Sequence, residues 1–396
     1  MASITKRHDG SWRARYRDDT GKEHAKHFDR KVDGQRWLDE VTASIVTGQY
    51  VDPRAARITF MEYAEAWRQG QVHRPSSVAH VETMLRRHAY PAFGSRQLGT
   101  VRPGEVQAWV KRLSSGSTDQ RALAPATVAV VHGLVAAIFK AAVRDRKLPS
   151  SPCDGIKLPR REPVQVVPLA TSAVWSLAAS VPQRHSALVT LAAGTGLRQG
   201  EAFGLTSDRV NFLRRTLTVD RQLLLLPGQG PRHAPPKTRA SYRVLPLPQV
   251  VLESLAEHLR EFPVADSGLI FTTEKGHPLN RTRFSASVWR PATQRAGLTG
   301  AVFHDLRHYY ASLLIRHGES VKVVQARLGH ATAAETLDTY SHLWPDSEDQ
   351  TREAIDAVLG APADRPGGRE VTPQVRACMR DESTCKPGSV PGASSR

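Results

Sequence analysis

Residues 304–344 read HDLRHYYASLLIRHGESVKVVQARLGHATAAETLDTYSHLW. We expect helices from residue 281 onward. On a helix, His304 and Arg307 share a face, and His308 lies one turn beyond His304. Leu-Gly-His follows at 328–330, and Tyr340 comes later, in the run Thr-Tyr-Ser-His. The segment is therefore predicted to be mainly helical and to carry a series of polar side chains suited to a site.

Each of these polar residues has an ordinary interpretation when it is taken alone. Two histidines at i and i+4 can bind a metal ion. However, Arg307 between them opposes a cation, and no Glu stands where a zinc protease needs its base. Tyr340 by itself is typical of a half-buried tyrosine. We therefore expect no metal ion and no cofactor here.

Two further sets of polar residues lie upstream of this segment. Residues 194–201, GTGLRQGE, place Arg198 at a glycine-rich break before a helix. Glycine lets the backbone approach a ligand, and an arginine can bind an anion through two parallel hydrogen bonds. A phosphate-binding loop is excluded, because no Gly-Lys-Ser/Thr ending is present and no strand leads in. Lys237 lies on a turn before a predicted strand, with Arg239 and Arg243 as competing basic residues.

The pattern of apolar residues predicts a multidomain α+β chain. Residues 1–57 are expected to form a small β-rich module with a helix at about 33–46, because Trp12, Ala14 and Tyr16 alternate along one strand face. Residues 58–160 are expected to form an all-α domain, with Val106, Trp109, Val110 and Leu113 at helical spacing. Residues 165–355 are expected to form a mainly α domain with a small β-sheet. Residues 360–396 are rich in Gly, Pro, Ser and Arg and are expected to be a disordered tail.

Within residues 165–355 the sequence predicts particular helices and strands. We expect helices at 171–180, 184–193, 199–205 and 249–261, and strands at 216–221, 242–247 and 268–272.

The net charge of the chain indicates a polyanionic partner. The formal charge is +17 and the pI is about 10.2. A large surplus of Lys and Arg favours nucleic acid, because each cation placed on a phosphate releases condensed counterions. The surplus is densest in residues 58–163, which hold 16 Lys and Arg against 8 Asp and Glu. We therefore expect the helical domain to make most of the contacts with double-stranded DNA.

Two basic clusters are candidate DNA contacts. Arg13, Arg15 and Arg17 share the second face of the first-module strand, which suits a DNA groove and equally suits a solvated face. Lys140, Arg144 and Lys147 lie at the end of a predicted helix, where cations suit the helix dipole and also suit phosphates.

Several classes of protein are disfavoured by the composition. We find no apolar run as long as the roughly 18–20 residues that a membrane span needs. The N-terminus lacks the apolar core of a secretory signal. The cysteines Cys153, Cys378 and Cys385 are too scattered for a disulfide framework or a zinc site. We expect a reduced cytosolic protein.

The ordered combination of these motifs resembles the tyrosine recombinases, also called phage integrases. It comprises Arg198 in Thr-Gly-Leu-Arg-x-Gly-Glu, Lys237, His-x-x-Arg at 304–307, Leu-Gly-His at 328–330 and Tyr340. The resemblance covers residues 165–345, and its three-part layout is similar to that of the larger integrases, with an arm-type DNA-binding module at 1–57 and a core-binding (SAM-like) domain at 58–160.

The resemblance implies a mechanism and a set of roles. Tyr340 attacks a phosphodiester and forms a 3′-phosphotyrosyl intermediate, while Arg198 and Arg307 hold the non-bridging oxygens. His304 accepts the tyrosine proton, Lys237 protonates the leaving 5′-oxygen, and His330 binds the phosphate. Glu201 is expected to orient the arginines. Because Arg, Lys and His supply positive charge, the mechanism requires no metal.

The resemblance also implies partners. They are attachment sites on double-stranded DNA, a homotetramer on that DNA, an excisionase as directionality factor and a host DNA-bending protein. The expected activity is site-specific integration, with excision as a second direction. Two alternatives stay open: a type IB topoisomerase-like enzyme and a catalytically silent sequence-specific DNA-binding regulator.

Overall fold

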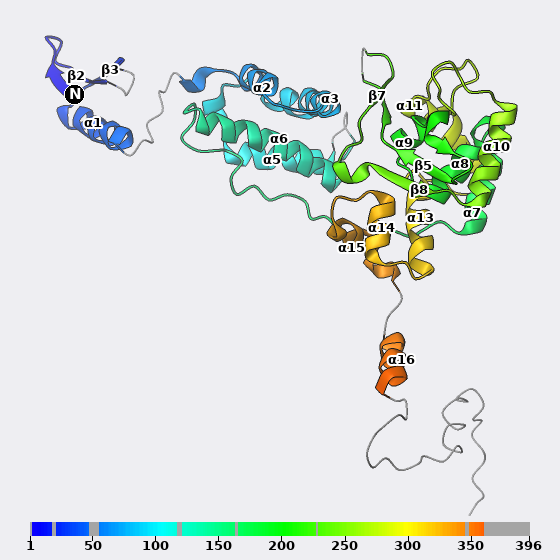
Figure 1. Cartoon of the computed structure of the whole chain (residues 1–396). Helices are drawn as coiled ribbons and strands as arrows, with labels where there is room; N and C mark the ends of the chain where they lie inside the picture. The colour runs from blue at the N-terminus through cyan, green and yellow to red at the C-terminus, as the bar shows by residue number, and fades with distance from the viewer. Residues whose placement is uncertain are drawn as a thin grey trace, which may run out of the picture. The chain divides into compact units, whose positions relative to one another are not determined.

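The computed structural model describes residues 2–17, 21–46, 55–116, 121–162, 165–226, 229–344 and 348–359 (Figure 1). The tail expected at 360–396 lies outside the described residues. The chain divides into two compact units, residues 1–341 and 342–396. Within the first unit, buried apolar side chains form separate clusters in the segments 4–45, 56–156 and 169–313. The fold is multidomain α+β, as predicted, and the domain boundaries stay a prediction.

The first segment is a small antiparallel sheet with one helix. Its elements are β1 (Ser3–Lys6), β2 (Trp12–Arg17), β3 (Glu23–Phe28) and α1 (Lys31–Val46), with strand order β1-β2-β3. Ala14 and Tyr16 are buried with Leu38 of α1, so strand alternation leaves the three arginines of β2 on the opposite face. The sequence pattern did not predict β1, because Ile4 is the one large apolar residue in it.

The second segment is all-α. Its helices are α2 (Phe60–Gln69), α3 (Pro75–Met84), α4 (Tyr90–Phe93), α5 (Pro103–Ser115) and α6 (Pro125–Arg144). A π-helical turn at Leu85–Ala89 joins α3 to α4. The predicted face of α5, from Val106 to Leu113, is buried in the cluster. The helical pattern therefore predicted the correct inner face.

Helix α6 corrects the expectation about apolar runs. By length and composition it is apolar enough to cross a membrane, and it is the one such helix among the described residues. Its buried residues include Val131, Val135, Ile138 and Phe139, all within the cluster of the helical segment. The helix is apolar because it packs as the central element of that core.

The third segment holds nine described helices and two small sheets. The helices are α7 (Thr171–Ser180), α8 (Gln183–Thr195), α9 (Gln199–Phe203), α10 (Gln249–Glu261), α11 (Arg281–Phe284), α12 (Arg290–Arg295), α13 (Asp305–Arg316), α14 (Val321–Leu328) and α15 (Ala333–Tyr340). One antiparallel sheet has the order β4 (Val210–Asn211), β5 (Thr216–Val219), β8 (Arg243–Pro246), and β6 (Gln222–Leu224) pairs with β7 (Arg232–Ala234). Helix α8 lies at the centre and contacts α7, α10 and α13.

The strand predicted at 268–272 is wrong. Leu269, Ile270 and Phe271 are buried, which explains their apolar character, but they make only isolated bridges from Leu269 to Thr206 and from Thr272 to Pro278. The partner segment turns into a 3-10 helix at Ser207, so no ladder can extend. Burial in a core between loops gave the same sequence signal as a buried strand.

The second unit begins at His342, two residues after the end of α15, so the 3-10 turn at Ser341–Leu343 spans the boundary between the units. The second unit contains helix α16 (Glu348–Leu359).

Candidate active site

Gly196 makes the turn from α8 to α9. It has a left-handed backbone with φ of +64°, which glycine adopts without strain. A Cβ at this position would lie 2.5 Å from Cδ1 of Tyr310. The turn requires glycine for both reasons, and it sets the position of Arg198 at the start of α9.

Arg198 is held from two sides and stays half-exposed. Its Nη2 donates to the carbonyl oxygen of Gly329 at 3.1 Å, and its Nη1 donates to Glu201 Oε1 at 3.1 Å. Gly329 is itself left-handed, with φ of +66°, and ends α14. The side chain is 29 % exposed, so part of the fixed guanidinium faces solvent and can bind an anion.

Glu201 joins Arg198 to a second arginine. Its buried carboxylate accepts from Arg243 Nη2 at 2.8 Å and from the Arg198 backbone N–H at 3.0 Å. Burial alone would raise the pKa of Glu201, but the hydrogen bonds and charges of Arg243 and Arg198 outweigh it and lower that pKa. Arg243 also donates to the carbonyl of Arg327 at 2.9 Å. Glu201 is therefore ionised and fixes both guanidinium groups.

Arg307, on α13, is buried more deeply than Arg198, with 2 % of its surface exposed. Its two terminal nitrogens donate to the carbonyls of Gly196 at 2.8 Å and Leu328 at 2.7 Å. Burial, followed by the positive charges of Arg198 and Arg243, lowers its pKa to about 9. It remains protonated at neutral pH and supplies a second fixed positive charge.

Tyr340 is the last residue of α15 and is 1 % exposed. Its hydroxyl oxygen lies 2.8 Å from Nδ1 of His308, in hydrogen-bond contact. Its ring stacks on His330 with centroids 6.4 Å apart. Burial raises the pKa of Tyr340 to about 12, although the charge of Arg307 opposes this. The hydroxyl is protonated at neutral pH and needs an acceptor before it can act as a nucleophile.

The histidines around Tyr340 are neutral at pH 7. Burial, then the charge of Arg307, lowers the pKa of His330 to about 4, and its Nδ1 lies 2.9 Å from Thr336 Oγ1. Partial desolvation and nearby positive charges also lower the pKa values of His304 and His308. Neutral imidazoles can accept a proton, so the site combines fixed cations with available bases.

The structure brings most of the predicted site residues into one connected set. Arg198, Arg307, His330 and Tyr340 are linked through shared contacts with α14 and α15. His304 joins through its ring, which lies edge-on to His308 at 4.8 Å.

Lys237 lies apart from this set. It is exposed after β7, and within the described part of the chain it makes no hydrogen bond or ion pair. The structure supplies no contact between Lys237 and the other predicted residues, so its role stays a prediction.

Two residues of the candidate active site, Arg243 and His308, were not identified from the sequence. Arg243 was treated as a competing basic residue, yet it is buried against Glu201, which lies 42 residues earlier. No local pattern reveals such a pair, because it depends on where β8 places its first residue. His308 was noted only as part of the second motif, although its position one turn after His304 was a signal that it shares that face.

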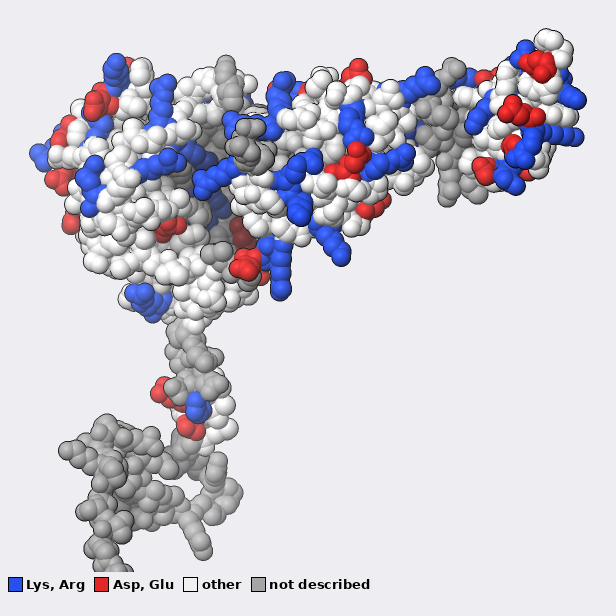
Figure 2. All heavy atoms as spheres, turned by 180° about the vertical axis from the view of Figure 1, so that it is seen from behind, with Lys and Arg blue, Asp and Glu red and all other residues white. Residues whose placement is uncertain are grey.

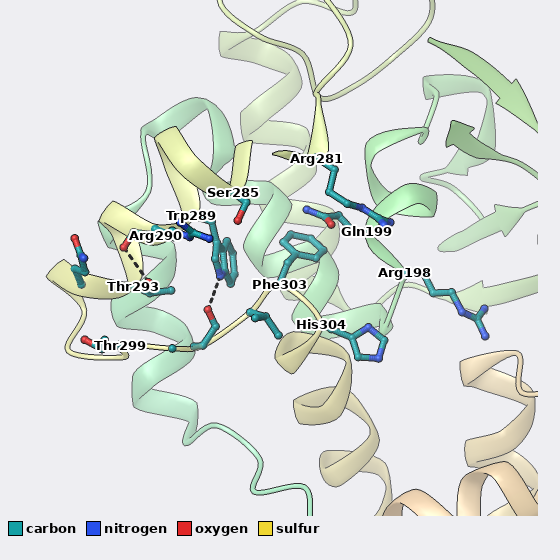
Figure 3. A pocket seen from close by; sticks show the side chains of 14 residues that line it. Arg198, Gln199, Arg281, Ser285, Trp289, Arg290, Thr293, Thr299, Phe303 and His304 are labelled. Carbon is teal, nitrogen blue, oxygen red and sulfur yellow. Dashed lines mark hydrogen bonds between the residues drawn. The ribbon is translucent and has the colours of Figure 1, made fainter. Parts of the chain in front are cut away.

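A pocket of about 690 Å³ opens beside the site (Figure 3). Arg198 and His304 line it together with Arg281 and Arg290, and no Asp or Glu is among its lining residues. Arg198 and His304 come directly before α9 and α13, and Arg281 and Arg290 are the first residues of α11 and α12. The pocket is therefore positively charged and continuous with Arg198.

The other candidate DNA contacts lie on surfaces. Arg15 and Arg17 of β2 are exposed, and Arg13 and Arg17 lie 3.6 Å and 4.0 Å from Glu23. Lys140 and Arg144 are exposed on α6, and Lys147 is half-buried. Figure 2 shows Lys and Arg side chains spread over the visible face of the helical segment. These positions leave both interpretations of the two clusters open.

No group of three or more His, Cys, Asp or Glu side chains with metal-binding geometry occurs in the described ranges.

Comparison with known proteins identifies the class. Residues 169–346 match the model of the phage integrase family. A putative prophage phiRv2 integrase of Mycobacterium tuberculosis is 26 % identical over 347 residues, which cover 84 % of this chain and 89 % of the relative. Tyrosine recombinase XerD of Corynebacterium glutamicum is 29 % identical, with 65 % of this chain and 83 % of the relative covered.

Solved structures share the fold. The Tn1549 transposon integrase in complex with a circular intermediate DNA superposes with a TM-score of 0.64 at 21 % identity, over 76 % of this chain and all of the other. A lambda integrase tetramer bound to a Holliday junction gives a TM-score of 0.52 at 16 % identity, over 84 % and 96 % of the two chains. The fold and the matched sequence define a DNA strand-breaking and rejoining enzyme. Residues 169–346 are a phage integrase family domain, and the relatives named above include a prophage integrase and a tyrosine recombinase.

Proposed function

We propose that this chain integrates one DNA molecule into another at specific attachment sites, with Tyr340 as the nucleophile of a 3′-phosphotyrosyl intermediate. The observation that carries the proposal is the grouping of Tyr340 with two fixed guanidinium groups, on Arg198 and Arg307, from elements far apart in the sequence. Excision is the reverse direction of the same chemistry.

The proposed roles follow from the charges. The transition state of phosphodiester attack gathers negative charge on the non-bridging oxygens, and preorganised donors stabilise it. Arg198 is held by a backbone carbonyl and is 29 % exposed, so it needs no rearrangement to do this. Arg307 is held by two backbone carbonyls and is 2 % exposed, so it must be uncovered together with Tyr340. In the tautomer in which Nδ1 accepts from the Thr336 hydroxyl, Nε2 of His330 carries the proton and adds a hydrogen-bond donor. Covalent linkage to Tyr340 conserves the bond energy, so rejoining needs no external energy source.

The leaving 5′-oxygen requires a proton, and the proposed donor is Lys237. Its exposed position after the β6–β7 hairpin leaves the ammonium available to DNA. The family resemblance assigns the tyrosine proton to His304.

DNA binding must also uncover the nucleophile. With 1 % of its surface exposed, Tyr340 cannot meet a phosphate in the described conformation. Tyr340 ends α15, and the next residue is the last of the first compact unit. A small shift of α15 is the simplest way to expose the hydroxyl.

The DNA backbone is proposed to continue from Arg198 into the adjacent pocket, where Arg281 binds a neighbouring phosphate. Arg281→Ala is expected to reduce the slope of log affinity against log salt by about 1. Arg283→Ala, on the same helix but outside this pocket, is the matched control. Equal slopes for the two variants would show that Arg281 does not bind a DNA phosphate in this pocket.

The proposed partners extend the same function. Four copies pair two duplex attachment sites, and the basic clusters of β2 and α6 contact DNA phosphates. An excisionase sets the direction of recombination, and a host DNA-bending protein bends the attachment-site DNA. The location is the bacterial cytosol at the nucleoid.

Helix α16 is proposed to dock on a neighbouring copy, so deleting residues 346–396 is expected to abolish tetramer assembly on DNA. Assembly that survives the deletion excludes this role.

A covalent capture assay tests the function. The protein is incubated with DNA fragments that flank its own coding sequence, in the presence of EDTA, then denatured and resolved for a DNA-linked band. A band that maps to one sequence supports site-specific cleavage without a metal. Bands spread over all fragments favour a topoisomerase, and binding without any band, even on nicked substrates, favours a silent regulator.

A further inference from the structure

In the described conformation, before any shift of α15, His308 is the side chain in contact with the hydroxyl of Tyr340. Its Nδ1 lies 2.8 Å from the hydroxyl oxygen of Tyr340, and the two rings are 5.6 Å apart. This is the hydrogen bond that the Tyr340 hydroxyl makes within the described part of the chain. A group that accepts a proton must lie within hydrogen-bond reach of it, and His308 meets that condition.

His304 occupies a different position. It lies edge-on to His308 with centroids 4.8 Å apart, and it lines the positively charged pocket beside Arg198. No hydrogen bond joins it to Tyr340 in the described structure. Figure 3 shows the His304 ring at the pocket edge, where a phosphate would lie if Arg198 bound one. Its placement suits contact with the phosphate.

We propose that His308, rather than His304, is the catalytic residue that takes the proton from Tyr340. As the Tyr340 oxygen forms its bond to phosphorus, its proton passes to Nδ1 of His308. The bond from phosphorus to the 5′-oxygen breaks, and that oxygen takes a proton from Lys237. In rejoining, the 5′-hydroxyl attacks and returns its proton to Lys237, the proton on His308 returns to Tyr340, and the phosphodiester is restored. This inference rests on the proposed function.

The surroundings of His308 support this exchange. Burial keeps the imidazole neutral, and the opposing charges of Asp305 and Arg307 act on it from its own helix. His304 and Tyr340 complete the titratable groups against it. The proposal requires the tautomer of the neutral ring that carries its proton on Nε2, because only then can Nδ1 accept from the Tyr340 hydroxyl.

The test uses three variants of the full chain on the DNA that the parent protein captures from fragments flanking its coding sequence. His308→Ala removes the acceptor, and His308→Asn keeps an amide oxygen able to hold the hydroxyl but unable to take its proton. His304→Ala, from the previous turn, is the comparison variant: it removes the imidazole placed by the phosphate and leaves the one in contact with Tyr340. DNA affinity and thermal melting are measured for each variant to show that it folds.

The rate of adduct formation decides between the roles. We expect His308→Ala and His308→Asn to cleave about 100-fold more slowly or worse. Added imidazole is expected to restore part of the His308→Ala rate, because it fits the vacated space and accepts the proton. The parent rate is expected to fall at low pH as His308 is protonated, and this dependence is expected to be lost in His308→Asn.

Three outcomes would overturn the inference. They are near-parental cleavage by His308→Ala, full activity of His308→Asn, or rescue by imidazole in His304→Ala alone. Full activity of His308→Asn would leave His308 as a positioning residue. If the parent protein forms no adduct, the proposed function itself fails, which separates that result from a failure of this inference.

Discussion

Arg198 donates to one backbone carbonyl and Arg307 donates to two, and the two side chains also differ in burial. Arg307 fills a buried position between the carbonyls of Gly196 and Leu328, whereas Arg198 is 29 % exposed. Arg307 is therefore expected to contribute to stability as well as to the proposed chemistry, and Arg198 mainly to the proposed chemistry. Substitution of the two arginines is therefore expected to affect cleavage alike but stability differently.

Replacing either arginine by Ala is expected to reduce adduct formation by about 100- to 1,000-fold, the usual effect of removing one preorganised donor. Only Arg307→Ala is expected to lower the free energy of unfolding substantially, by about 1–3 kcal/mol for each buried carbonyl left without a donor. Cleavage rates and denaturant unfolding of both variants, with DNA affinity as the control, check this. A near-parental recombination rate in either variant contradicts the active-site assignment.

His330 makes stability depend on pH. Its pKa of about 4 in the folded protein lies below the roughly 6.5 of an unfolded chain. Between these values the unfolded state binds the extra proton, so the free energy of unfolding falls as pH falls from 6.5 towards 4. The expected loss at pH 5 is about 2 kcal/mol. In His330→Gln the slope across this range is expected to be smaller, as measured by urea unfolding at several pH values, and an unchanged slope would contradict it.

Two helix ends shape the site at the scale of elements. Helix α8 ends at Gly196 and α14 ends at Gly329, and the carbonyl groups of these two left-handed glycines accept from Arg307 and Arg198 respectively. Each glycine thus turns the chain and also holds one of the two arginines that we propose to be catalytic.

Gly196→Ala tests whether this turn is required. Gly297→Ala is the matched control, since Gly297 has φ of +71° but open space where a Cβ would stand. Both variants are expected to lose about 1–2 kcal/mol of stability, because alanine is strained in a left-handed conformation. Only Gly196→Ala meets Tyr310, so it is expected to cost about 1–3 kcal/mol more and to lose cleavage. Equal melting temperatures for the two variants would show that the close approach is unimportant.

Some helices could be predicted from the sequence, whereas one strand and the contacts between distant residues could not. Helices at 171–180 and 249–261 were predicted with the observed bounds, because their apolar faces repeat regularly. The buried run at 268–272 was misassigned, because burial without a strand partner leaves the same composition. The motif residues could be identified, but the Arg243–Glu201 pair and the hydrogen bond between Tyr340 and His308 depend on three-dimensional packing. The position of Lys237 relative to the site has the same dependence.

At the scale of the whole molecule, charge governs DNA affinity. The chain carries a formal charge of +17, with its densest surplus in the helical segment. Such a distribution is typical of binding that is dominated by phosphate contacts and weakens steeply with salt.

The triple variant Lys140→Ala, Arg144→Ala, Lys147→Ala is expected to lower DNA affinity and to reduce the slope of log affinity against log salt by about 3. Binding titrations at several salt concentrations measure this. Because these residues lie outside the catalytic cluster, saturating protein is expected to restore the parental cleavage rate. An unchanged slope would mean that these three residues do not bind phosphates and interact only with the dipole at the C-terminal end of α6.

The central claim is that Tyr340 carries the covalent bond to DNA. The direct measurement is mass spectrometry of the peptides released from the captured adduct, with Tyr340→Phe analysed in parallel. The account predicts a nucleotide on the peptide that contains Tyr340 and no adduct from the Phe variant. A nucleotide on another residue, or an adduct that persists in Tyr340→Phe, would contradict it.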